Sequence, residues 1–211
     1  MTKLLVLGAR GQIARHVIAD LVPETDIEQT LFARRIDGVR NAPDNATLIQ
    51  GDVLNRAELD AAMAGQDVVY ANLTGEDLDD QASAVIASMQ ANGVKRLIFV
   101  LSLGVYDEVP GKFGQWNAEI IGEDLKPFRR AADAITASGL DFTIVRPAWL
   151  TDADEVDYET TARDEPFKGT EVSRKSVAAF IADLVRDPSR GVGGDFGLNK
   201  PGTDGDKPAF M

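Results

Sequence analysis

The chain has 211 residues, of which 44% are hydrophobic and 27% are charged, as is typical of one sizeable globular domain. It has no cysteine and one histidine, His16, which excludes a disulfide scaffold, a cysteine-bound metal centre and a multi-histidine metal site. A formal net charge of -12 disfavours binding to nucleic acid or to an anionic membrane surface. The apolar runs are too short to span a bilayer, and no signal peptide is predicted at Met1, so we expect a cytoplasmic protein.

Short apolar runs alternate with amphipathic segments along the chain. The apolar runs predict strands over residues 4–7, 30–33, 46–50, 67–72, 96–102 and 141–145, the last one stopped by Arg146-Pro147. The amphipathic segments predict helices over residues 11–22, 55–63, 80–92, 126–138 and 173–186, with caps at Asn55 and Ser173 and stops at Gly93 and Gly139. Residues 103–125 show no periodicity, and a loop is expected over 149–168. The tail 199–211 is rich in Gly, Pro and Asp, and is either ordered or frayed.

This alternation predicts right-handed βαβ units, and therefore an α/β fold with a doubly wound parallel sheet of the Rossmann type. We expect a single domain over residues 1–211. Within it, residues 1–150 would form a cofactor-binding core, and residues 151–211 a substrate-side extension with a small lobe over the sheet edge.

The first predicted strand runs directly into Gly8-Ala9-Arg10-Gly11-Gln12-Ile13-Ala14, which has the spacing G-x-x-G-x-x-A. In that position Gly8 permits a tight turn, Gly11 lets the backbone approach a pyrophosphate, and Ala14 lets the helix pack closely on the strand. The N-terminus of the helix adds free N–H groups and a positive dipole. The motif therefore predicts a dinucleotide site, the alternative being a turn that binds nothing.

The residues after the second strand predict which dinucleotide binds. An acidic residue there would favour NAD, but this chain has Arg34 and Arg35, and Arg10 adds a third positive charge. Because guanidinium groups suit a 2′-phosphate, we predict NADP(H) rather than NAD(H), the alternative being solvated surface arginines. Asp52, after the third strand, is either an acceptor for the adenine amino group or a turn residue.

Together with Leu101 to Tyr106 and Thr143 to Pro147, these motifs resemble the atypical short-chain dehydrogenase/reductase superfamily. Within it the chain is most similar to the NAD(P)H-binding group of NmrA-like and biliverdin-IXβ/flavin-reductase-like proteins. The resemblance implies a set of cofactor contacts. They are Gly8, Arg10, Gly11, Gln12 and Ile13 at the pyrophosphate, Arg34 and Arg35 at the adenosine phosphate, Asp52 and Val53 at the adenine, Ala71 and Asn72 at the ribose, and Ser102, Pro147, Ala148 and Trp149 around the nicotinamide.

The chain departs from mainstream members of that superfamily, which use a Tyr-x-x-x-Lys pair. The residues four positions after its three tyrosines are Thr74, Pro110 and Ala162. The catalytic candidates are therefore the hydroxyls of Ser102 and Tyr106, and Trp116 and Trp149 are candidate substrate walls. A site without the pair suits flavins or quinones, because these accept a hydride directly into a conjugated ring.

We therefore predict an NADPH-dependent oxidoreductase that reduces a small planar acceptor such as a flavin or quinone. One alternative is a non-catalytic NADP(H) sensor of the NmrA type, which would regulate a protein partner. Another is a nucleotide-sugar epimerase or reductase, which the missing Tyr/Lys pair and the short C-terminal region disfavour. The expected partner is a small-molecule substrate, with no nucleic acid and no membrane. No metal is expected, because the acidic cluster at 152–157 lacks the central glycine of a calcium loop.

Overall fold

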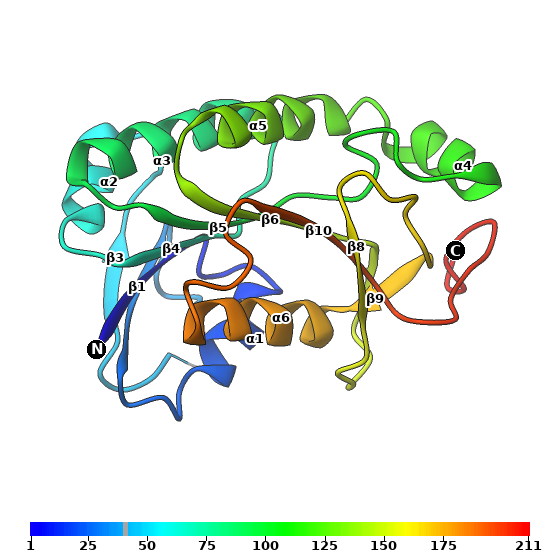
Figure 1. Cartoon of the computed structure of the whole chain (residues 1–211). Coiled ribbons are helices and arrows are strands. Elements are labelled where there is room, and N and C mark those ends of the chain that lie inside the picture. Colours follow the sequence, from blue (N-terminus) through cyan, green and yellow to red (C-terminus); the bar gives the residue numbers. More distant parts are fainter. Residues whose placement is uncertain (40–41) are drawn as a thin grey trace.

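The computed structural model describes residues 1–39 and 42–211, and its centre is an eight-stranded sheet (Figure 1). The strands lie in the order β3-β2-β1-β4-β5-β6-β10-β8, and all neighbours are parallel except β10 and β8. Their bounds are β1 (Thr2–Leu7), β2 (Ile27–Ala33), β3 (Thr47–Gln50), β4 (Val68–Ala71), β5 (Arg96–Val100), β6 (Asp141–Pro147), β8 (Glu159–Ala162) and β10 (Gly194–Asn199). A small parallel sheet pairs β7 (Trp149–Thr151) with β9 (Glu171–Ser173).

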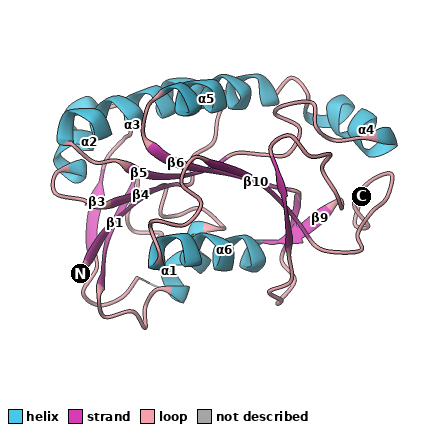
Figure 2. Cartoon of the chain, viewed as in Figure 1, coloured by secondary structure: helices cyan, strands magenta, loops and turns pink. Residues whose placement is uncertain are grey.

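Helices cover both faces of the large sheet, which confirms the doubly wound α/β fold (Figure 2). On one face α1 (Ala14–Asp20) packs against α6 (Arg174–Arg186). On the other face α3 (Leu78–Asn92) lies between α2 (Arg56–Met63) and α5 (Leu125–Ala137). The remaining helix, α4 (Gly111–Ile121), lies beyond the end of α5 and near the C-terminus.

The surroundings of β1 explain why its residues are apolar at successive positions. Leu4 and Val6 belong to the core beneath α1 and α6, whereas Leu5 and Leu7 belong to the core beneath α2, α3 and α5. All four side chains are fully buried. A strand between two helix layers has no solvent-facing side, so an uninterrupted apolar run is the expected pattern.

Local signals placed four helix ends correctly, whereas α1 is shorter than the predicted 11–22 and α3 begins two residues before the predicted start at Asp80. The Asn55 side chain accepts a hydrogen bond from the Glu58 N–H (3.4 Å), and the Ser173 hydroxyl accepts one from the Ser176 N–H (2.9 Å). Gly93 and Gly139 have φ values of 70° and 72°, the left-handed conformation that ends a helix.

Other elements differ from the prediction. The helix α4 lies within 103–125, where none was predicted, because only Phe113 and Asn117 are buried in it and no apolar stripe results. The strand β6 continues through Arg146 and Pro147 instead of stopping before them. The strands β7, β8 and β9 are only three or four residues long, too short to show a pattern, and β10 was not predicted. Residues 151–211 therefore extend the main sheet through β8 and β10 and supply the strand β9 of the small sheet.

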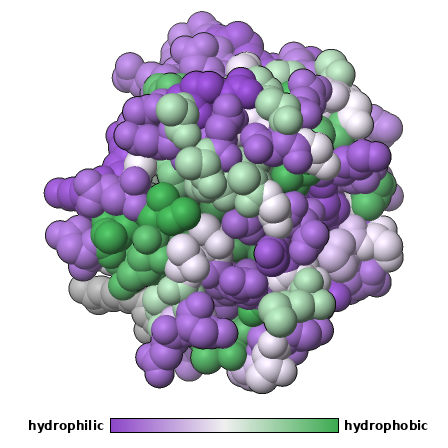
Figure 3. Space-filling model, turned by 90° about the vertical axis from the view of Figure 1, so that its left-hand side faces the viewer, coloured by the Kyte–Doolittle hydropathy of each residue, from purple (hydrophilic) through white to green (hydrophobic). Residues whose placement is uncertain are grey.

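The surface shown in Figure 3, on the side at the left of Figure 1, is mostly hydrophilic, with apolar residues gathered in a limited patch. Across residues 1–39 and 42–211, no helix combines the length and the apolar character needed to cross a bilayer.

Candidate functional site

The glycine loop lies where the ends of β1, β2 and β4 meet. The Gly8 N–H donates to the Phe32 carbonyl (3.0 Å) at the end of β2, and the Asn72 N–H donates to the Leu7 carbonyl (2.9 Å). Gly8 has a φ of 78°, and a Cβ on it would collide with the Asn72 carbonyl. A Cβ on Gly11 would collide with the Asn72 side-chain amide. Both glycines are therefore required by the close approach of β4, and they leave the backbone of the loop open to a ligand.

A cavity of about 570 Å³ opens above this loop. It brings together most of the predicted cofactor contacts, namely Gly8, Arg10, Gly11, Arg34, Arg35, Asp52, Val53 and Asn72. The other predicted contacts are not in its lining. Gln12 is exposed on the loop, while Ile13 and Ala71 are buried beneath it. The contacts predicted around the nicotinamide, Ser102, Pro147, Ala148 and Trp149, line a neighbouring cavity.

Three arginines form the rim of this cavity. Arg34 and Arg35 are exposed at the end of β2. The Arg10 guanidinium lies over Gly38, where a Cβ would collide with it, so the absence of a side chain there lets Arg10 reach the same rim. Within the described part of the chain, none of the three is paired with a carboxylate. Guanidinium groups on such a rim can hold a phosphate group of a ligand.

Asp52 has the turn role that was one of its two predicted alternatives. Its Oδ1 accepts a hydrogen bond from the Leu54 N–H (3.0 Å), and its own N–H donates to Glu58 (2.9 Å). The turn holds the carboxylate in the lining of the cavity.

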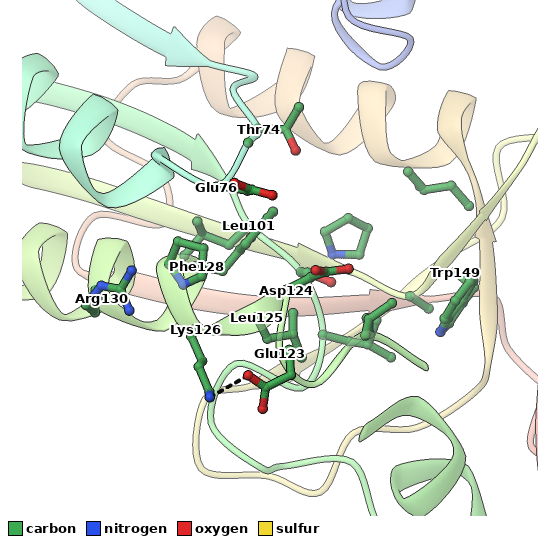
Figure 4. A pocket seen from close by; sticks show the side chains of 18 of the residues that line it. Thr74, Glu76, Leu101, Glu123, Asp124, Leu125, Lys126, Phe128, Arg130 and Trp149 are labelled. Carbon is green, nitrogen blue, oxygen red and sulfur yellow. Dashed lines mark hydrogen bonds and ion pairs between the residues drawn. The ribbon is translucent and has the colours of Figure 1, made fainter. Parts of the chain in front are cut away.

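A second, larger cavity of about 840 Å³ meets the first at Thr74, which lines both (Figure 4). Ser102 and Pro147 line it from just beyond β5 and from the end of β6, two neighbouring strands. Trp149 forms part of its wall on the side opposite Phe128. Parallel α/β sheets bind ligands outside the carboxyl ends of their strands, and both cavities lie there.

The Trp149 ring is held in a fixed orientation. Its indole N–H donates to Oδ1 of the buried Asn117 (2.9 Å) on α4. The ring of Trp116 packs against it with centroids 4.8 Å apart and planes at 52°. Trp116, which was predicted to be a second wall, does not line this cavity and instead supports Trp149 from behind.

Tyr106, predicted with Ser102 as a catalytic candidate, lies away from that cavity. Its hydroxyl donates to Asp195 Oδ2 (2.7 Å), and its ring lies 4.2 Å from the Arg163 guanidinium. It lines a separate cavity of about 590 Å³. Burial, with the hydrogen bond to Asp195, raises the pKa of the Tyr106 phenol far above 10, so this group stays protonated and acts as a donor. Its position shortly after β5 predicts a place near the nicotinamide, but the loop after β5 has no periodic pattern that would show the direction of its side chain.

A buried charge network fixes the loop that follows β5. Arg146 is fully buried, and its Nε donates to Asp195 Oδ1 (2.5 Å) while its Nη1 pairs with Glu108. Glu108 also accepts the N–H groups of Gly104 (3.0 Å) and Tyr106 (2.9 Å). The network ties this loop, and Ser102 at its start, to β6 and β10. An arginine within the apolar run 143–147 was the available sequence signal, but nothing marked Glu108.

Residues 8–188 match the family described as NAD(P)H-binding, so the chain belongs to that family. A Rossmann-fold NAD(P)-binding family protein from Shigella flexneri is 60% identical, with all of both chains covered and a TM-score of 0.87. A short-chain dehydrogenase/reductase from Veillonella parvula, solved in complex with NADP, is 27% identical, with 99% of each chain covered and a TM-score of 0.90. The isoflavone reductase homolog A622 of Nicotiana tabacum is 23% identical over 214 residues, covering 89% of this chain. The chain spans 65% of the length of that relative.

Proposed function

We propose that this protein is an NADPH-dependent reductase that transfers a hydride to a small planar acceptor, such as a flavin or a quinone. The observation that carries the proposal is the meeting of the two cavities at Thr74. One has the glycine loop and the three arginines of a dinucleotide site, and the other has a flat aromatic wall. A cofactor that extends from the first into the second would present its reactive ring to an acceptor.

The cofactor contacts follow from the first cavity. The glycine loop and the N-terminus of α1 would hold the pyrophosphate, with Gln12 and Ile13 contributing backbone N–H groups. Arg10, Arg34 and Arg35 would hold the 2′-phosphate, and this arrangement supports NADPH over NADH. Val53 and Asp52 would contact the adenine, while Ala71 and Asn72 would border the ribose. The NADP complex of the Veillonella relative is consistent with this preference.

The chemistry of the second cavity depends on few protein groups. When bound, the nicotinamide supplies the hydride. Ser102 and Pro147 would border it, and the Ser102 hydroxyl makes no hydrogen bond to another described residue, so it is available to donate to an acceptor oxygen or nitrogen. Trp149 would stack on the acceptor ring and exclude water from it. A ring that takes up a hydride directly needs only this limited help.

The test is to measure NADPH oxidation against flavins, quinones and simple carbonyls, with NADPH and NADH binding measured in parallel. We expect turnover with a flavin or a quinone and tighter binding of NADPH than of NADH. Turnover confined to carbonyls would contradict the planar acceptor. Tight NADPH binding without turnover on any acceptor would contradict the reductase and favour the sensor alternative.

A further inference from the structure

The larger cavity has a cationic side chain, Arg174, that the proposed reaction does not use. Arg174 is the first residue of α6 and follows Ser173, the last residue of β9. Because Ser173 pairs with Thr151 in the small sheet, Arg174 is placed next to the strand β7 that carries Trp149. Both side chains line the same cavity.

The hydrogen bonds of Arg174 are incomplete. Its Nη1 donates to Asp152 Oδ1 (3.0 Å), and the Asp152 side chain is 71% exposed, so this partner lies on the solvent side. The Arg174 side chain itself is only 18% exposed. Its Nε is buried and donates to no described residue. A buried N–H without an acceptor is unfavourable. The Nη2 of the same guanidinium also has no hydrogen bond to a described residue and is not buried, so a ligand oxygen could accept from it.

The other two cations of the cavity are engaged differently. Lys126 donates to Glu123 (2.6 Å), and Arg130 donates to Asp79 (2.5 Å). Neither has a buried nitrogen that lacks a partner among the described residues. Three carboxylates, Glu76, Glu123 and Asp124, also line the cavity and would repel an anion from their part of it. An anionic group is therefore favoured beside Arg174.

We propose that Arg174 binds an anionic substituent of the acceptor, a carboxylate or a phosphate, while the acceptor ring lies against Trp149. This inference rests on the proposed function and narrows its substrate class to planar acceptors that carry an anionic side group. A guanidinium and such an anion form charge-assisted hydrogen bonds, which are stronger than neutral ones.

Riboflavin and flavin mononucleotide are a matched pair of probes, because they share one ring system and differ by a single phosphate. Wild-type protein should bind the phosphorylated flavin more tightly. Arg174→Ala should weaken that binding by about 10-fold or more and leave riboflavin binding unchanged. Arg174→Lys should keep part of the preference, since it keeps the charge. Arg130→Ala is the control, because it removes a cation of the same cavity that is already paired.

Binding should be measured by flavin fluorescence in the presence of NADP⁺, which has no hydride to transfer. Failure of this proposal is then distinguishable from failure of the proposed function, since no turnover is needed. An Arg174-dependent preference for the phosphorylated flavin without any NADPH oxidation would support the anion site and contradict the reductase. Equal binding of the two flavins by the wild type, equal losses in Arg174→Ala, or a loss confined to NADPH affinity would overturn the proposal. Thermal unfolding of the Arg174→Ala and Arg174→Gln variants checks that both remain folded.

Discussion

Gly8 combines a left-handed backbone with the close approach of the Asn72 carbonyl. We predict that Gly8→Ala lowers the free energy of unfolding by about 1–3 kcal/mol and weakens NADPH binding, because both the strain and the collision displace the loop. Chemical denaturation and NADPH titration would measure the two effects. Gly205→Ala is the matched control, since a Cβ there meets only ordinary contacts of 3.5 Å and longer. Unchanged binding in Gly8→Ala would contradict the role of the loop.

We propose that the exposed pair Arg34 and Arg35 sets the preference between NADPH and NADH. We predict that Arg34→Ala or Arg35→Ala raises the dissociation constant of NADPH by about 10-fold, the effect of losing one charge-assisted bond, while that of NADH changes little. Calorimetry at fixed ionic strength would measure both constants. Lys95→Ala, which removes an exposed charge elsewhere, serves as the control. Equal losses for the two cofactors would show that these arginines do not contact the 2′-phosphate.

Ser102 and Tyr106 should respond differently to loss of their hydroxyls. Ser102→Ala should reduce kcat with a planar acceptor by about 10- to 100-fold, if its hydroxyl donates to the acceptor. Tyr106→Phe should leave the rates near wild type and lower the free energy of unfolding by about 1 kcal/mol, because it removes a single hydrogen bond to Asp195. Steady-state kinetics with denaturation of both variants would test this. A larger kinetic loss in Tyr106→Phe than in Ser102→Ala would reverse the two assignments.

At the scale of the elements, α4 holds the Trp149 ring through the hydrogen bond to Asn117 as well as through packing of Trp116. Asn117→Ala should raise KM for a planar acceptor several-fold with a smaller change in kcat, because the Trp149 ring loses its fixed orientation. In a Trp116→Phe background, Trp149 is the one tryptophan left of the two in the chain, so its emission reports the change directly. Asn117→Asp retains an acceptor oxygen and should restore both properties. Unchanged Trp149 emission and an unchanged KM in Asn117→Ala would contradict the role of the Asn117 hydrogen bond in orienting Trp149.

The end of β6 shows how one element can hold another in place. Arg146 lies between the carboxylates of Glu108 and Asp195, so the loop after β5 is tied to β6 and β10 at once. A fully buried arginine is tolerated because its Nε and Nη1 each meet a carboxylate, although its Nη2 has no partner among the described residues. The position of Ser102 therefore depends on residues of strands that lie far along the chain.

At the scale of the whole molecule, the three tyrosines share one property. Burial raises the pKa of Tyr70, Tyr106 and Tyr158 above the ordinary value of 10.0. The folded state therefore holds their protons more tightly than the unfolded state, and stability should be fully present below pH 10 and fall as the pH rises beyond it. Absorbance at the phenolate band should show little ionisation of the native protein near pH 10 and full ionisation in denaturant. Ordinary titration of the native protein would contradict the burial of these rings.

Much of this molecule follows from its sequence alone. The apolar runs, the helical stripes and the cap residues determined the doubly wound sheet, because each depends on neighbours a few residues away. The same holds for the glycine loop, since a turn between a strand and a helix is a local requirement. Arg34 and Arg35 directly follow β2, and the position of a strand in the sheet also fixes the position of the residues at its end.

Only the tertiary structure decided which side chains share the cavity with Ser102. Tyr106 points to Asp195, 89 residues away, and Arg146 is buried by partners 38 and 49 residues away. Trp149 lines the cavity and Trp116 does not, because α4, which shows no apolar stripe in the sequence, carries Trp116 and packs it behind Trp149. Side-chain direction in a loop depends on contacts made across the fold, and a sequence pattern read over a few residues does not contain them.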